Sequence, residues 1–485
     1  MNNTKNNKLE SGQIIVLLAV SLVVVIVAAA LAIDGGMIYS ERRFAQNVAD
    51  AASLAGAGAV LETIHNDGNS IDLSCPIDST QVTDSSIVMI AYNAALDNAK
   101  NSNNMSELPF LGYKYNSNKI IDNQIDANHG IVIHCYYNEY ERHLDVEVRV
   151  TTQISTAFAH LIFPGPMATS NIAIATTEPP HDLGYGYGIV SLSDQCQNNT
   201  DGMEFSGTND VTVYGGGIHS NSCLTGSGNV QVIAEDYLDD EGNTIEGSIS
   251  LGYSDAVVNG GATFDPYPPI GGAPAVPYTD VPVPTCSTTI IELEDPKHNS
   301  GSINQGSYSG LKMTGGELTL NKGRYCFYGD VEVTGGSLYG EEVMIFMIEG
   351  DIKINGNAIV QLIAPYSDVD DPYYGMLIYM SPNNPGLIAL VGNEESIYSG
   401  TIYAPTGSVE LGGTSTASSP AEQCKIVYDE NGIVYDEYGD PLCEAVTFST
   451  QIVAWYVKVV GTSQIDILFD DSKNNKTRTT LYLIK

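Results

Sequence analysis

The sequence predicts a mainly β protein with an N-terminal α segment, arranged as a transmembrane helix, a small α/β unit and a right-handed parallel β-helix, or solenoid. Three observations lead to this fold class. An apolar run lies near the N-terminus, a strictly alternating segment precedes residue 180, and short apolar motifs recur about every 20 residues in the second half. The expected domains are 1–40 for the anchor, 41–180 for the α/β unit, and 181–285 and 286–485 for two solenoid segments.

The anchor is expected in Ile14–Ile33, which is apolar throughout except for Ser21. A helix rises about 1.5 Å per residue, so this run spans roughly 30 Å, the thickness of a bilayer's hydrocarbon core. A signal peptide has a shorter apolar core that ends at a small-residue cleavage site, whereas Ala28–Ala30 lies inside this run. We therefore expect a retained single-pass helix. The alternative is a secreted protein cleaved after Ala30 or Ala32.

The chain is strongly acidic, with a formal net charge of −38 from 58 acidic and 20 basic residues. No Lys or Arg occurs between Arg149 and Lys297. Nucleic-acid binding needs clustered cations, so the composition excludes nucleic acid as a partner. The acidity favours solubility through self-repulsion, with divalent-cation binding as the alternative.

The eight cysteines are dispersed and form no CxxC motif, which argues against zinc and thioredoxin-like sites. On a membrane-tethered chain they indicate disulfides in an oxidising compartment, and buried free thiols are the alternative. Their connectivity does not follow from the sequence, so the simplest expectation pairs neighbours. These pairs are Cys75–Cys135, Cys196–Cys223, Cys286–Cys326 and Cys424–Cys443.

Helical spacing resumes after the anchor and continues to Ala59, with Asp34-Gly35-Gly36 as a possible hinge at the membrane surface. Two pairs of small residues lie four apart, at Ala52/Gly56 and Ala55/Ala59. Small residues on one face let two helix backbones approach closely. The helix either packs on its own domain or contacts a helix of another subunit.

The α/β unit is expected to end at Pro179-Pro180. Its clearest strand is Leu144–Val150, in which every second residue is Leu or Val and the residues between are charged. The other expected elements are a helix over Ser85–Lys100 capped by Asp84, strands over Ile131–Tyr137 and Asn171–Thr176, and a short helix over Ser155–Phe163 stopped by Pro164.

The N-terminal segment resembles that of TadE/TadG-like Flp pilus-assembly proteins. The resemblance rests on Gly12-Gln13, Asp34-Gly35-Gly36 and the segment Arg43–Ala57. It implies a membrane-anchored, pilin-like component of a tight-adherence pilus. The chain departs from the short Flp pilins because no acid follows Gly12 before Asp34. This departure argues against prepilin-peptidase processing and for the long TadG-like type, although the DxSxS metal site of a von Willebrand A domain is absent from the sequence.

The second half of the chain repeats a short motif. Each copy consists of an apolar-x-apolar segment followed by a polar residue, then Gly or Asn, then a further apolar residue. This repeat predicts stacked coils of parallel strands. A β-sandwich is the alternative, but it would not keep this period. Matching segments are 209–213 with 228–232, 311–318 with 331–338 and 352–359, 388–392 with 409–413, and the late copy 457–461. Segments 191–222 and 399–413 also resemble β-helical extensions of TadE/TadG-like proteins.

Two stretches interrupt this repeat. Residues 264–286 contain seven prolines and predict a loop or seam between the two solenoid segments. Residues 415–445 predict an inserted hairpin, with its tip at Asp429–Gly432 and a disulfide between Cys424 and Cys443 at its base.

Catalytic chemistry is not expected. A solenoid lyase or hydrolase would need carboxylates and a base aligned on one exposed face. The scattered candidates are Asp330, Glu332, Asp351, Arg324 and Lys353. The acidic stretches Asp368–Asp371 and Asp239–Asn243 lack the ligand spacing of a calcium loop, and His129, His134 and His143 are expected to flank strands. We predict no catalytic, cofactor-binding or metal residue.

These features predict a structural or adhesive protein of the cell envelope. The N-terminal helix would cross the membrane and pack with pilus or envelope proteins, and the acidic solenoid would face outward toward a surface glycan or another cell. The competing hypothesis is a membrane-tethered, carbohydrate-active solenoid enzyme, a polysaccharide lyase or hydrolase.

Overall fold

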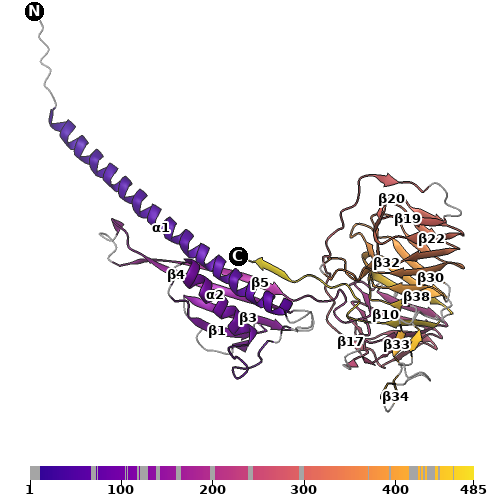
Figure 1. Ribbon diagram of the computed structural model, residues 1–485. Coiled ribbons are helices and arrows are strands. Elements are labelled where there is room, and N and C mark those ends of the chain that lie inside the picture. The colour runs from indigo at the N-terminus through magenta and orange to yellow at the C-terminus, as the bar shows by residue number, and fades with distance from the viewer. Residues whose placement is uncertain are drawn as a thin grey trace, which may run out of the picture. The chain divides into compact units, whose positions relative to one another are not determined.

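The computed structural model in Figure 1 forms two compact units. One comprises Met1–Pro180 with Thr479–Lys485, and the other comprises His181–Arg478. The structure describes residues 11–66, 73, 75–103, 105, 107–116, 119–120, 129–137, 142–159, 165–196, 202–238, 244–293, 300–369, 371–392, 395–413, 424–426, 428–429, 432–433, 443–445, 448–462 and 464–484.

The first unit begins with a continuous helix, α1 (Ser11–Asn66), which is 56 residues long. The expected hinge at Asp34-Gly35-Gly36 is wrong, because the helix runs through it. Two glycines cost a helix about 1 kcal/mol each, yet α1 stays continuous across them. A second helix, α2 (Ile87–Asn103), starts two residues later than predicted. Ser86, and not Asp84, caps it by accepting the Met89 N–H at 3.4 Å.

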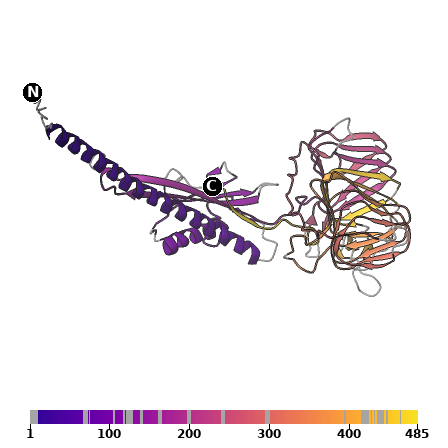
Figure 2. The ribbon, with the colours of Figure 1, turned by 90° about the horizontal axis from the view of Figure 1, so that it is seen from above.

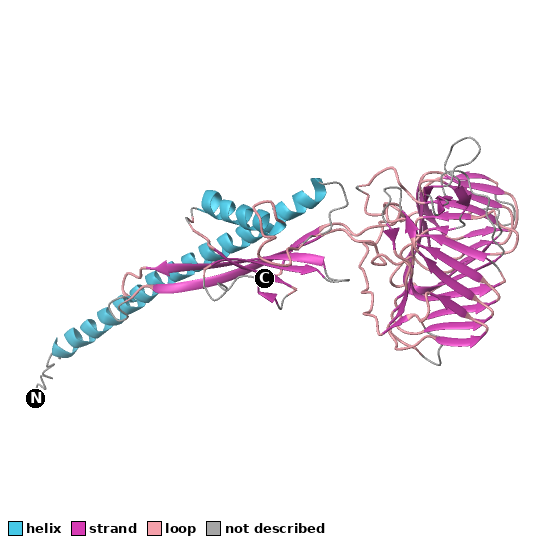
Figure 3. Cartoon of the chain, turned by 90° about the horizontal axis from the view of Figure 1, so that it is seen from below, coloured by secondary structure: helices cyan, strands magenta, loops and turns pink. Residues whose placement is uncertain are grey.

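Both helices lie on one face of a six-stranded sheet (Figure 3). On β4 the side chains of Leu144, Val146, Val148 and Val150 are fully buried, as their alternation predicts. The strand order is β2 (Lys119–Ile120), β1 (Phe110–Tyr115), β3 (Gly130–Tyr137), β4 (Arg142–Ile154), β5 (Met167–Glu178) and β40 (Thr480–Leu483).

The C-terminal strand corrects the expected domain boundary. Residues 286–485 were all expected in the solenoid, but β40 pairs antiparallel with β5 of the first unit, with Thr480 opposite Glu178. The strand's apolar side chains give no sign of this partner, because Leu481 and Leu483 are each 40% exposed.

The second unit is a stack of coils built from parallel strands (Figure 2), which we call the solenoid. One side is a ten-stranded sheet in the order β16 (Thr263–Asp265), β11 (Gln231–Glu235), β8 (Asp210–Tyr214), β39 (Gln464–Leu468), β37 (Phe448–Ser449), β31 (Ile397–Ser399), β28 (Ile359–Ile363), β25 (Ser337–Gly340), β22 (Glu317–Leu320) and β19 (Gly301–Ile303).

The other sides of the coils belong to an eighteen-stranded sheet. Its strands are β6 (Ile189–Ser191), β7 (Met203–Gly207), β9 (Ile218–Ser220), β10 (Leu224–Gly228), β14 (Ile249–Leu251), β15 (Val257–Gly260), β17 (Ile270–Gly271), β18 (Ile290–Ile291), β20 (Gly306–Tyr308), β21 (Leu311–Met313), β23 (Gly323–Phe327), β24 (Val331–Val333), β26 (Val343–Met347), β27 (Ile352–Ile354), β29 (Met376–Met380), β30 (Leu387–Gly392), β32 (Thr401–Gly413) and β38 (Ile452–Gly461). The short pair β12 (Tyr237–Leu238) and β13 (Thr244–Ile245) is antiparallel.

The predicted repeats stack in register. Leu311 lies opposite Val331, and Val331 lies opposite Ile352. The column continues through Ile388 and Val409 to Val457. These side chains are buried in one continuous core, because no coil alone can cover its apolar residues. The right-handed sense of the coils stays a prediction.

The chain does not fill this stack from one end to the other. It enters in the middle at β8 and winds outward through β11 to β16. It restarts at the opposite end with β19 and winds back until β39 lies beside β8. The two predicted solenoid segments therefore meet through their first and last coils.

The Pro-rich stretch connects the two ends of the stack. We call residues 272–287 the strap. The strap exchanges two hydrogen bonds of 2.8 Å between Val276 and Asn221, and Tyr379 donates to the Val281 carbonyl at 2.8 Å. Ser307 donates to the Ser287 carbonyl at 2.8 Å. These partners lie on coils spread along the stack, so the expected seam is a lengthwise strap.

The predicted insertion has the expected antiparallel pairing. Strand β33 (Cys424–Ile426) pairs with β36 (Cys443–Ala445), and β34 (Tyr428–Asp429) pairs with β35 (Gly432–Ile433). Asp429 lies opposite Gly432, as the predicted hairpin tip requires. The remaining residues of 415–445 lie outside the described part of the chain.

Candidate functional site

The candidate functional site is the N-terminal half of α1. Its large apolar side chains are highly exposed, from 49% at Ile33 to 75% at Leu31. Among the described helices, α1 is the one long and apolar enough to cross a membrane. An apolar stretch of this size is costly in water, whereas a bilayer would cover it on every side.

The uninterrupted apolar run ends at Asp34, whose own side chain is only 5% exposed. Its carboxylate accepts the backbone N–H groups of Ala157 at 2.7 Å, Phe158 at 3.1 Å and Ala159 at 2.5 Å. Charged acceptors of this kind form strong hydrogen bonds. Asp34 thus joins the helix to the turn after β4, at the point where the apolar run stops. The sequence signal was a lone acid after twenty uncharged residues, but its partners could not be read from the pattern.

The small residues of α1 pack inside the first unit. Ala52 is fully buried, and a Cβ added at Gly56 would lie 2.8 Å from the Ala91 carbonyl oxygen and 2.9 Å from a Val146 methyl. Of the two predicted alternatives for the helix, packing on its own domain therefore explains Ala52 and Gly56. Ala55 and Ala59 are half-buried.

Three predicted disulfides are confirmed. Cys75 bonds Cys135 in the first unit, and the solenoid contains Cys196–Cys223 and Cys286–Cys326. The side chains of Cys424 and Cys443 lie outside the described residues. All described cysteines are therefore bonded, which fits an oxidising compartment.

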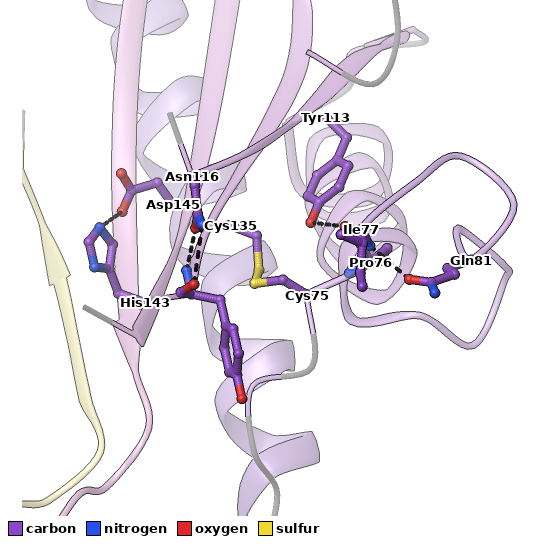
Figure 4. The surroundings of a disulfide bond; sticks show 10 residues. Cys75, Pro76, Ile77, Gln81, Tyr113, Asn116, Cys135, His143 and Asp145 are labelled. Carbon is purple, nitrogen blue, oxygen red and sulfur yellow. Dashed lines mark hydrogen bonds and ion pairs between the residues drawn. A yellow bond between two sulfur atoms is a disulfide. The ribbon is translucent and has the colours of Figure 1, made fainter. Parts of the chain in front are cut away.

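Figure 4 shows how the first disulfide is supported. Cys75 precedes Pro76, whose carbonyl oxygen accepts the Tyr113 hydroxyl at 2.8 Å. Next to Cys135 along the sheet, Asn116 exchanges hydrogen bonds with the Tyr137 backbone, donating at 3.2 Å and accepting at 2.8 Å. The disulfide therefore fastens the segment after α1 to the sheet.

The predicted catalytic candidates do not converge. Glu332 on β24 and Lys353 on β27 lie opposite each other, but Glu332 pairs with Lys312 at 2.5 Å and Lys353 with Asp351 at 2.8 Å. Asp330 accepts the Asp351 N–H at 2.9 Å. These carboxylates join neighbouring coils. Arg324 lies elsewhere, over the ring of Tyr373.

The three histidines belong to the sheet of the first unit. His134 and His143 lie within strands β3 and β4, and His129 directly precedes β3. His134 lies 3.0 Å from Glu147, and Arg149 lies 2.5 Å from the same carboxylate. Burial alone would raise the pKa of Glu147, but its bonds to His134 and Arg149 lower the pKa to about 2.

The acidic stretches form no metal centre in the described chain, where no group of three potential ligands occurs. Asp371 accepts the Tyr373 N–H at 2.9 Å as part of a turn. Asp370 and residues 239–243 lie outside the described residues.

The comparisons with known proteins bear on this same helix. Residues 12–59 match the family model "Putative Flp pilus-assembly TadE/G-like". No curated protein and no solved structure matches the chain significantly. The matched residues contain the exposed apolar run, Asp34 and the buried small residues Ala52 and Gly56. The N-terminal segment of this chain, residues 12–59, is therefore similar to TadE/G-like Flp pilus-assembly proteins, and this similarity together with the apolar helix supports a membrane-anchored pilus-assembly component.

Proposed function

We propose that the protein is a minor pilin-like component of a Flp-type pilus or a related envelope apparatus. Its anchor crosses the membrane once, and the bulk of the chain lies on the extracytoplasmic side. The solenoid is displayed outward as a structural or adhesive element. The exposed apolar run that ends at Asp34 carries this proposal, because the Asp34 carboxylate joins the end of that run to the folded unit.

The disulfides support the proposed orientation. All three occur beyond the anchor, and two lie in the solenoid. Disulfides persist outside the cytosol, so the segment that carries them belongs on the oxidising side of the membrane.

The proposed mode of action is assembly and contact, without turnover of a substrate. The carboxylates of Glu332, Asp351 and Asp330, in or directly before β24 and β27, are used in ion pairs and in a backbone hydrogen bond between coils. Partners of the anchor are other pilus or envelope proteins, and partners of the solenoid are surface groups.

Protease treatment of intact cells tests the orientation. Cells that carry the chain with a C-terminal tag are exposed to proteinase K before and after the membrane is opened. We expect the solenoid to be degraded on intact cells while a membrane-embedded N-terminal fragment remains. Protection of the solenoid until lysis would contradict the proposal.

Surface attachment tests the adhesive role. Antibody fragments against the solenoid should reduce attachment of cells that display the chain, and fragments against an unrelated envelope protein serve as the control. Equal attachment with and without the solenoid antibody would remove the adhesive role and leave the anchor intact.

A further inference from the structure

A groove of about 610 Å³ lies on the solenoid between the C-terminal end of the strap and residues 365–373. Thr285 and Ser287 line it from the strap, and Gly323 and Arg324 of β23 line it from the coil. Its size lies within the range of small-ligand sites, about 300–1,000 Å³. The Cys286–Cys326 disulfide lines the groove and ties the strap to β23.

Arg324 is held at this groove by an aromatic ring. Its guanidinium carbon lies 4.3 Å from the centre of the Tyr373 ring, and Tyr373 donates to the Pro282 carbonyl at 2.9 Å. The Tyr373 ring is thus bonded to the strap, and its contact with Arg324 holds the guanidinium group in position.

The guanidinium has unused hydrogen-bonding capacity. Its nearest acid, Asp371, is 3.8 Å from Nη2, and Nε is buried without a hydrogen-bond partner. A ligand oxygen in the groove would reach the Nη groups, because the Arg324 side chain is 32% exposed.

The remaining wall is rigid and of mixed charge. The Glu342 carboxylate accepts the N–H groups of Tyr366 at 3.0 Å and Ser367 at 3.2 Å, and Lys322 lies 3.4 Å away. These bonds hold Tyr366 and Ser367 against the coil. Lys322 and Arg324 are thereby set among the acids Glu342, Asp368 and Asp371.

This chemistry suits a ligand rich in hydroxyl groups. A hydroxyl both donates and accepts, so it can use the carboxylates and the cations of the groove together. A chain with a net charge of −38 repels anions at long range, which disfavours an acidic ligand. We propose that the groove binds a short neutral oligosaccharide, with Arg324 donating to a sugar oxygen. This inference rests on the proposed adhesive function and names its ligand class.

Binding by the purified full chain in lipid nanodiscs tests the groove. The probes are immobilised neutral di- to tetrasaccharides and uronic-acid oligosaccharides of the same lengths. We expect binding to neutral probes, a loss of at least tenfold in Arg324→Gln, and an intermediate loss in Arg324→Lys, which keeps the charge without the fork. Lys312→Gln, on β21 outside the groove, should bind as the wild type does.

Each opposite result overturns the inference. The inference is wrong if the wild type binds no neutral probe or binds only the acidic probes. It is also wrong if the wild type and Arg324→Gln bind equally. Thermal unfolding and near-UV circular dichroism verify that Arg324→Gln is folded. Antibody inhibition of cell attachment is independent of these probes. Attachment that requires the solenoid but tolerates Arg324→Gln refutes the groove alone, whereas failure of the topology test refutes the proposed function.

Discussion

Val457 lies opposite Met203 in adjacent parallel strands, although the two belong to the last and first coils of the solenoid. The same β38 pairs on its other edge with β32, where Val457 lies opposite Val409. The stack is therefore closed in its middle by residues from the two ends of its own sequence. Its stability depends on contacts across this junction and along the strap.

Removing a tyrosine hydroxyl from the strap contacts should loosen the strap. Tyr403 donates to the Thr279 carbonyl, and both residues are buried. In Tyr403→Phe the buried carbonyl loses its donor, which should lower the free energy of unfolding by about 1–3 kcal/mol. Urea unfolding measures the loss, and hydrogen exchange should show faster exchange in the strap. The half-buried Tyr339→Phe on β25 is the control, and an equal loss there would contradict this role of Tyr403.

The strap's disulfide should stabilise the solenoid specifically. Cys286 and Cys326 are 40 residues apart, and closing a loop of this size contributes about 2–4 kcal/mol. Replacing both with serine should shift the solenoid's urea transition to lower concentration. Replacing Cys75 and Cys135 should leave that transition in place, because this pair lies in the first unit. An unshifted transition in the first variant would show that the strap is held without its disulfide.

Asp34→Asn should free the turn after β4 from the helix. The amide keeps an acceptor but loses the charge that serves three N–H groups, so we expect a loss of about 1–3 kcal/mol in local stability. Hydrogen exchange of the full chain in nanodiscs should show Ala157 and Ala159 exchanging at least tenfold faster. Asp97→Asn, on the exposed face of α2, is the control. Unchanged exchange at both amides would mean that Asp34 does not hold the turn.

The first unit should lose stability in acid through Glu147. Its pKa is lowered to about 2 in the folded chain from an ordinary value of 4.5, so its stabilising contribution is complete above pH 4.5. The contribution is lost as the pH falls from 4.5 toward 2, because the unfolded chain takes up the proton first. Unfolding monitored between pH 7 and 2 should show this slope, and Glu147→Gln should flatten it. Glu62→Gln, with a carboxyl on the outer side of α1, should not.

Local patterns predicted much of the fold. Three patterns carried this information: the apolar run, the alternation of Leu144 to Val150 and the period of the coils. Each shows which side chains are buried, because the spacing of apolar residues along the chain determines it. The simplest expectation, that neighbouring cysteines pair, matched three disulfides, although the sequence did not determine the connectivity. The hinge at Asp34 was wrongly expected because Gly35 and Gly36 weaken a helix locally, whereas the contacts of Asp34 lie more than a hundred residues away.

The anchor could be predicted from the sequence, but the groove could not. The sequence located the anchor, but Arg324 gave no local sign of its position beside Tyr373. The strap helps to form one groove from residues on separate coils. Its proline-rich sequence does not show which coils it contacts.

The sequence by itself determined that an apolar helix, a small α/β unit and a stack of coils follow one another, because each depends on the spacing of apolar residues along the chain. Only the tertiary structure decided the order of the coils, the return of β40 to the first unit and the course of the strap. Neighbouring coils present similar inward columns of apolar side chains, so these columns alone do not determine the order of the coils. The choice among them depends on contacts between residues far apart in sequence, such as Tyr403 with Thr279.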